Sequence, residues 1–118
     1  MDDLVQFLRA RLDEDARDAE AAGDSWYGYE PEQQIAFVSV ADARHIARHS
    51  PFRVLSDIAA KLDLLELHEA TDTKIGPGPV CMICDDLSGN GPTHPCRTLR
   101  LLARPYADHP DYRDTWRP

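Results

Sequence analysis

The chain has 118 residues, about the length of one domain. Its formal net charge is −8, and the first 35 residues hold ten acidic side chains against three arginines. Such an acidic front repels phosphate backbones, which argues against general nucleic-acid binding. No apolar run approaches the roughly 20 residues that cross a bilayer, and the N-terminus lacks the basic start of a secretory signal. We therefore expect a cytoplasmic protein without a membrane partner.

Hydrophobic spacing predicts a mainly α fold with three to four helices and one small β-hairpin. The first helix is expected over residues 3–22. Its apolar stripe repeats at every fourth position and consists of Leu4, Leu8 and Leu12. The turn-rich stretch after it fits a hairpin in which residues 26–29 pair with a strand at 35–40.

Two further helices are expected in the middle of the chain. Asp42 is expected to cap a short helix that ends at Arg48. Ser50 is expected to cap a longer helix from Pro51 to about residue 69, because proline is favoured at the first helical position. The apolar stripe of this helix consists of Leu55, Ile58, Leu62 and Leu65. His68 is its next member, so its side chain is expected to point inward.

The last third of the chain is expected to contain one more helix. Residues 71–80 are expected to be a loop, because glycine and proline alternate at 76–79. A short helix is expected over residues 98–103. The segment 105–118 is expected to be an extended C-terminal tail, whose aromatic side chains either anchor it on the protein's own core or dock on a partner.

Three cysteines within sixteen residues form the most informative cluster. An odd number cannot close into disulfides, so metal ligands or redox groups are the better interpretation. Cys81 and Cys84 form a C-x-x-C pair between two turn-rich stretches, which is the pattern of a zinc knuckle. Cys96 is the expected third ligand, and it opens the last helix, where unpaired backbone N–H groups stabilise a thiolate.

Zinc takes four ligands in a tetrahedron, so one ligand must come from elsewhere. His68 is preferred, because binding through it would lock the long helix to the knuckle. His94 is the alternative, although the single residue between it and Cys96 makes chelation of one ion awkward. Water, His45 and His49 stay open as further alternatives. A redox pair and inert buried thiols are the competing interpretations of the cysteines.

A zinc ion with four protein ligands has no open position for a catalytic water, so we expect structural zinc and no enzymatic activity. The chain is then a single zinc-stapled domain over residues 1–118. The leading hypothesis is a non-enzymatic interaction or regulatory protein that binds another protein. The alternative is a small nucleic-acid-binding regulator that uses the zinc knuckle together with Arg97, Arg100 and Arg104.

Three stretches of the sequence resemble a known family: residues 1–15, residues 45–51 and, most specifically, PCRTLRLLARPYADHPDYR at 95–113. The chain resembles a domain-of-unknown-function group of short proteins from actinobacteria, notably streptomycetes, and their phages. The resemblance covers most of the chain except about residues 16–40. It implies that the elements carrying the four expected ligands recur together, and that the position of His94 is often aromatic, which favours His68. It implies no activity.

Overall fold

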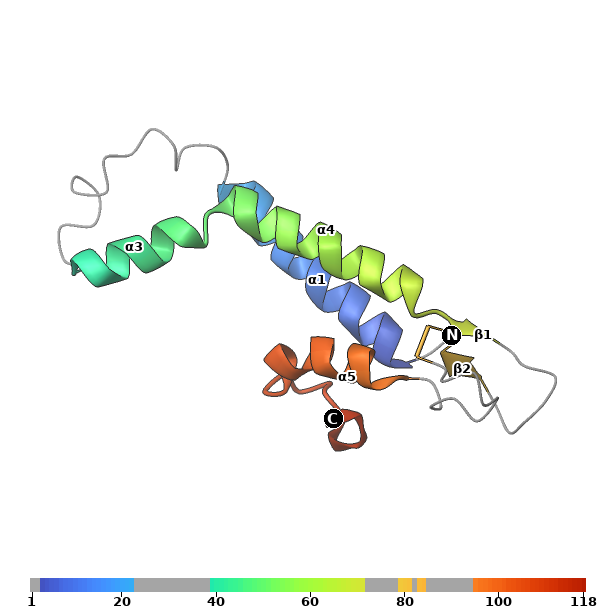
Figure 1. Ribbon diagram of the computed structural model, residues 1–118. Coiled ribbons are helices and arrows are strands. Elements are labelled where there is room, and N and C mark those ends of the chain that lie inside the picture. Colours follow the sequence, from blue (N-terminus) through green and yellow to red (C-terminus); the bar gives the residue numbers. More distant parts are fainter. Residues whose placement is uncertain (1–2, 23–38, 72–78, 82, 85–94) are drawn as a thin grey trace. The chain divides into compact units, whose positions relative to one another are not determined.

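The computed structural model describes residues 3–22, 39–71, 79–81, 83–84 and 95–118 (Figure 1). Its α-helices are α1 (Asp3–Ala22), α3 (Val40–Arg48), α4 (Pro51–Leu67) and α5 (Arg97–Ala103). The strands β1 (Ala70–Thr71) and β2 (Val80–Cys81) lie between α4 and α5, and the 3₁₀ turns η2 (Arg104–Tyr106) and η3 (Asp114–Trp116) follow α5. The mainly α fold is confirmed. None of the described helices combines the length and the apolar character that a membrane span requires.

The contacts within the chain divide it into two compact units. Unit 1 comprises residues 1–12 and 61–118, and unit 2 comprises residues 13–60. Among the described residues, most of the buried apolar side chains belong to unit 1. Apart from Cys81 and Cys96 they are Leu4, Phe7, Leu8, Leu12, Leu65, Leu99, Ala103 and Trp116. Among the described residues of unit 2, the buried apolar side chains are those of Ala19, Pro51 and Ile58.

The start of α3 differs from the prediction. Ser39 is the N-cap, because its hydroxyl oxygen accepts a hydrogen bond from the backbone N–H of Asp42 at 3.1 Å. The same hydroxyl donates to the Asp42 carboxylate at 2.8 Å, which fixes the orientation of the hydroxyl. Asp42 therefore supports the cap from inside the first turn. The strand predicted for 35–40 is wrong at Ser39 and Val40, and the rest of that hairpin lies outside the described residues.

The start of α4 follows the prediction. The Ser50 hydroxyl accepts a hydrogen bond from the backbone N–H of Arg53 at 3.4 Å, and Pro51 occupies the first helical position. The helix ends at Leu67, two residues before the predicted end. The backbone N–H of His68 still donates to the carbonyl of Leu64 at 3.1 Å, as in a continuing helix. His68 therefore stays on the same side of the helix as the apolar stripe.

Two residue pairs join β1 and β2 into an antiparallel ladder, Ala70 with Cys81 and Thr71 with Val80. The loop predicted for 71–80 is therefore wrong at its two ends. A ladder of this length has no alternation of polar and apolar residues that a sequence pattern could reveal. Its effect is to hold Cys81 beside the residues that follow α4.

The segment after α5 is a series of tight turns rather than an extended tail. Backbone hydrogen bonds close each turn, for example from Ala107 to Arg104 at 3.1 Å and from Trp116 to Arg113 at 2.9 Å. The turns bring four rings around Phe7, with centroid separations of 6.3 Å to Tyr106, 5.5 Å to His109, 6.1 Å to Tyr112 and 5.1 Å to Trp116. These separations are typical of favourable aromatic contacts. Of the two interpretations left open by the sequence, anchoring on the protein's own core is the one that this packing fits.

Charged groups hold the same segment from outside. Arg113 pairs with Asp3 at 2.7 Å, and its guanidinium lies 5.3 Å from the ring centroid of Trp116. The guanidinium of Arg11 lies 5.3 Å from the centroid of Phe7 and donates to the imidazole of His109. The first turns of α1 and the C-terminal turns therefore belong to one packed core within unit 1.

We expect the substitution Phe7→Ala to lower the free energy of unfolding by about 3–5 kcal/mol, because it leaves a cavity among four rings. The matched control is Leu101→Ala on α5. Leu101 is 40 % exposed, so the control should cost about 1 kcal/mol or less. Equilibrium urea unfolding under reducing conditions measures both. Similar losses for the two variants would contradict the central position of Phe7.

Candidate metal centre

One histidine and three cysteines converge at one end of unit 1: His68, Cys81, Cys84 and Cys96. Their donor atoms all lie within 4.8 Å of one another. His68, Cys81 and Cys96 are buried, and Cys84 is half-buried. These are the four residues that the sequence favoured as metal ligands, and the structure brings them together.

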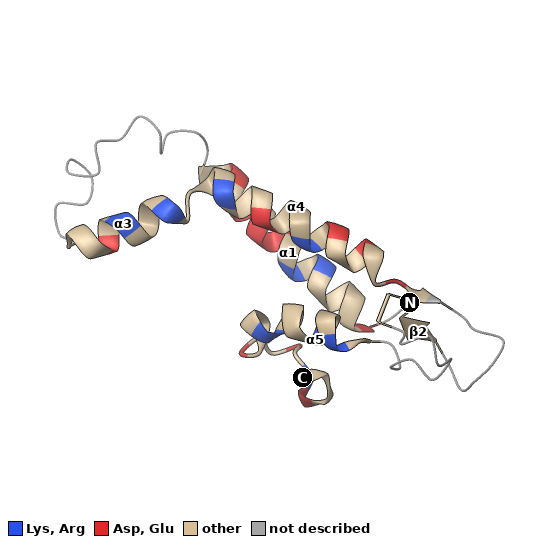
Figure 2. Cartoon of the chain, viewed as in Figure 1, with Lys and Arg blue, Asp and Glu red and all other residues tan. Residues whose placement is uncertain are grey.

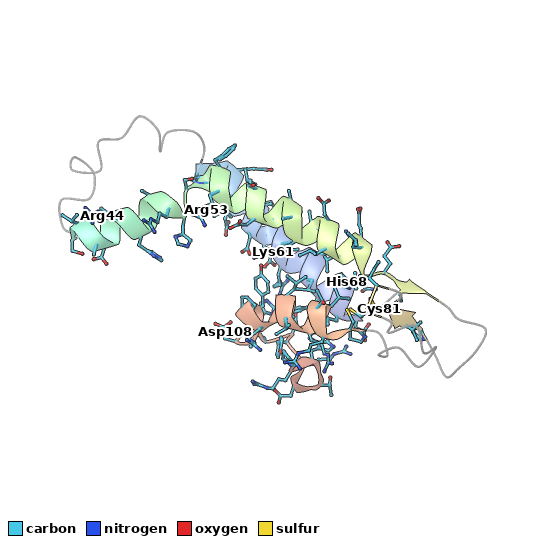
Figure 3. All side chains as sticks on the ribbon, viewed as in Figure 1. Arg44, Arg53, Lys61, His68, Cys81 and Asp108 are labelled. Carbon is cyan, nitrogen blue, oxygen red and sulfur yellow. The ribbon has the colours of Figure 1, made fainter. Side chains whose placement is uncertain are left out.

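Each donor comes from a different element. His68 directly follows α4, and Figure 3 labels it near Cys81, which lies on β2. Cys84 lies in a turn three residues later, so the C-x-x-C spacing directs both sulfurs toward the same point. Cys96 is the N-cap of α5. The four donors therefore link the end of the long helix, the short ladder and the start of the last helix.

The distances suit one tetrahedral ion. The Nδ1 atom of His68 lies 3.2 Å from the sulfur of Cys81 and 3.5 Å from the sulfurs of Cys84 and Cys96. A zinc ion with Zn–S bonds of about 2.3 Å and a Zn–N bond of about 2.0–2.1 Å separates nitrogen and sulfur by about 3.6 Å at the tetrahedral angle. All three distances lie within about half an ångström of that value. The donor set and its geometry therefore fit a four-coordinate metal through Nδ1 of His68.

The histidine is directed to this point by the periodicity of α4. Leu65 belongs to the same stripe, and its side chain is 1 % exposed. His68 lies three residues further on, and its side chain is 7 % exposed. Its burial confirms the predicted inward orientation. A buried imidazole requires polar partners, and three sulfurs supply them here.

The thiol of Cys96 is protonated in the metal-free protein at neutral pH. Its pKa is raised from 9.0 to about 11, mainly by burial and to a smaller extent by the neighbouring sulfurs of Cys84 and Cys81. The backbone N–H of Leu99 acts in the opposite direction, although the start of α5 makes no full capping hydrogen bond to the sulfur. The helix start therefore acts on the pKa of Cys96 in the expected direction, but burial outweighs it in the metal-free protein. A metal that binds here must displace this proton.

The alternative histidine ligands were His94, His45 and His49. His94 falls outside the described residues. His45 and His49 lie on α3 and at its end, in unit 2, where their exposed rings stack at 4.4 Å and Nδ1 of His49 bonds the carbonyl of His45 at 2.8 Å. They are not members of the donor cluster.

The three arginines of the nucleic-acid alternative lie on α5 and directly after it. Arg97 and Arg104 are exposed. Arg100 is half-buried, and its guanidinium donates to the backbone carbonyl of Arg117 at 3.3 Å. At least one of the three therefore takes part in holding the C-terminal segment.

Sequence reasoning missed Thr98. Its hydroxyl lies 3.8 Å from the sulfur of Cys84, in the first turn of α5. A hydroxyl that donates to a metal-bound thiolate orients the ligand and reduces its charge, as outer-shell groups do in metal sites. The only signal in the sequence is that Thr98 follows Cys96 by two residues, which does not distinguish it from other threonines.

We expect Thr98→Val to lower the affinity for Zn²⁺ by about tenfold, because the sulfur of Cys84 loses this donor while the volume of the side chain is kept. Competition with a chromophoric chelator measures the affinity. The control is Thr115→Val, at an exposed position in η3, which should leave the affinity unchanged. The thiolate-to-metal charge-transfer band of Co²⁺-substituted protein should also shift for Thr98→Val alone. Equal affinities and identical spectra would remove Thr98 from the site.

Comparison with known proteins gives a family and no function. No curated protein and no solved structure matches the chain. A family model described as a family of unknown function, DUF6221, matches residues 1–118. Because this match spans the whole chain, the protein belongs to the DUF6221 family.

Proposed function

We propose that the protein is a structural zinc protein without catalytic activity, whose metal-stapled end binds another protein. The observation that carries the zinc proposal is the position of His68 Nδ1, within 3.2–3.5 Å of three cysteine sulfurs. Thiolate and imidazole donors in a tetrahedron are the preferred ligands of zinc in structural sites. His68, Cys81, Cys84 and Cys96 hold the ion in this proposal.

The free energy of metal binding is large enough to decide whether this end of the protein is ordered. Structural zinc in small peptides binds with about 10–16 kcal/mol. The total stability of a typical domain is about 5–15 kcal/mol. The ion would join the end of α4 and the start of α5 to the strands β1 and β2, which have only two residues each. The metal would therefore supply much of the stability of this end.

The surface next to the ligands supports an interaction role. Leu67 precedes His68 and is 55 % exposed, and Ile83 precedes Cys84 and is 57 % exposed. Apolar side chains held at a rigid position suit recognition of another protein. Four protein ligands leave the metal without an open position, which supports a role other than catalysis. The net charge of −8 favours a protein partner over nucleic acid.

Metal analysis of the reduced, untagged protein tests the zinc proposal. We expect one zinc ion per chain, and a melting temperature that falls in the presence of a strong chelator. The substitution His68→Ala should abolish stoichiometric zinc, whereas His45→Ala should retain it, since His45 lies outside the donor cluster. Purified protein without stoichiometric metal, and with a melting temperature indifferent to the chelator, would refute the proposal.

Affinity capture tests the interaction role. The resemblance to streptomycete and actinophage proteins makes a streptomycete extract the appropriate source of partners. We expect the zinc-loaded protein to retain a specific protein that Ile83→Ser bait loses, because this substitution changes the exposed surface and no ligand. A salt-sensitive mobility shift on DNA or RNA, without any retained protein, would favour the nucleic-acid alternative instead.

A further inference from the structure

Helix α3 is well capped and yet buries none of its residues. Ser39 caps its N-terminus, and at its C-terminus the backbone N–H of His49 donates to the carbonyl of Ile46 at 3.1 Å. Of its five apolar side chains, four gather on one face, namely those of Val40, Ala43, Ile46 and Ala47. Val40 is 70 % exposed. Ala47 is exposed as well, and Ala43 and Ile46 are half-buried, so none of these four side chains is fully covered.

A helix of this kind requires a partner surface. Isolated helices shorter than about 12–15 residues are marginal in water, and helices in proteins gain most of their stability by packing an apolar face. Helix α3 has nine residues. The first turn of α4 adds a second uncovered apolar group, Phe52, which is 69 % exposed. The two exposed side chains belong to the same unit of the chain, unit 2.

The charges of unit 2 are divided between its helices (Figure 2). Residues 13–22 of α1 hold five acidic side chains against one arginine. Residues 40–53 hold three arginines and two histidines against one aspartate. Arg44 and Arg48 lie four residues apart on α3, and neither has an ion pair among the described residues. Glu14 and Asp18 have the same spacing on α1, and both are exposed.

We propose that a second copy of this chain covers α3, so that unit 2 is a homodimer interface. In this arrangement Arg44 and Arg48 of one copy face Glu14 and Asp18 of the other, and Val40 and Phe52 are removed from water. Each copy carries both the basic and the acidic surface. A two-fold axis therefore pairs the basic surface of each copy with the acidic surface of the other. Small units with few buried side chains commonly gain stability by oligomerisation, and few side chains are buried among the described residues of unit 2. The proposal does not depend on the metal centre, which belongs to unit 1.

Sedimentation equilibrium of the full, metal-loaded chain tests the proposal. We expect wild-type protein to dimerise in the micromolar range, and more weakly as the salt concentration rises. Arg44→Glu/Arg48→Glu and Glu14→Lys/Asp18→Lys should each weaken the dimer by about tenfold or more. An equimolar mixture of the two variants should associate again, because the reversed charges are then complementary. Phe52→Ser should weaken the dimer without any change of charge.

The matched control is Arg97→Glu/Arg104→Glu, which changes the charge equally at two exposed positions of unit 1. This variant should dimerise like the wild type. A wild-type chain that stays monomeric at hundreds of micromolar would overturn the proposal. A control that weakens association as much as the α3 variant would overturn it too, as would charge-reversed variants that fail to associate when mixed.

Discussion

The structure of unit 1 depends on one buried imidazole that faces three sulfurs. His68 sits where the apolar stripe of α4 would otherwise continue, and its Nδ1 atom lies within 3.5 Å of each sulfur. A buried polar group without partners costs about 1–3 kcal/mol, so the buried imidazole needs the three sulfurs as its polar partners. The donors come from segments up to 28 residues apart. Their convergence determines how the end of α4, the strand β2 and the start of α5 are held together.

The features that depend on a regular spacing of residues could be predicted from the sequence. Helices α1 and α4 were recognisable from leucines at helical spacing, and the same spacing identified His68 as an inward residue. The C-x-x-C pair was recognisable because two thiolates at this spacing can reach one ion. Each of these features has a short-range cause that the sequence displays directly.

The parts that could not be predicted depend on contacts between distant residues or on competing effects. The turns after α5 are ordered by packing of four rings on Phe7, about a hundred residues earlier in the chain. The protonation of Cys96 depends on burial, which outweighs the effect of the helix start and is visible only once the fold is known. For α3, Asp42 was the expected N-cap, whereas the cap is Ser39, a residue that the sequence pattern had assigned to a strand.

The start of α5 contributes both to the donor cluster and to the apolar core. Cys96 directs its sulfur to the donor cluster, and Leu99, three residues later, is fully buried in the core. Each residue of an α-helix is rotated by about 100° from the one before it. Inserting or deleting a single residue between Cys96 and Leu99 would therefore rotate one of them relative to the other. Either the Cys96 sulfur would leave the donor cluster or the Leu99 side chain would leave the core. Exposed positions such as Arg97 can vary in chemistry, but the length of this segment is fixed by geometry.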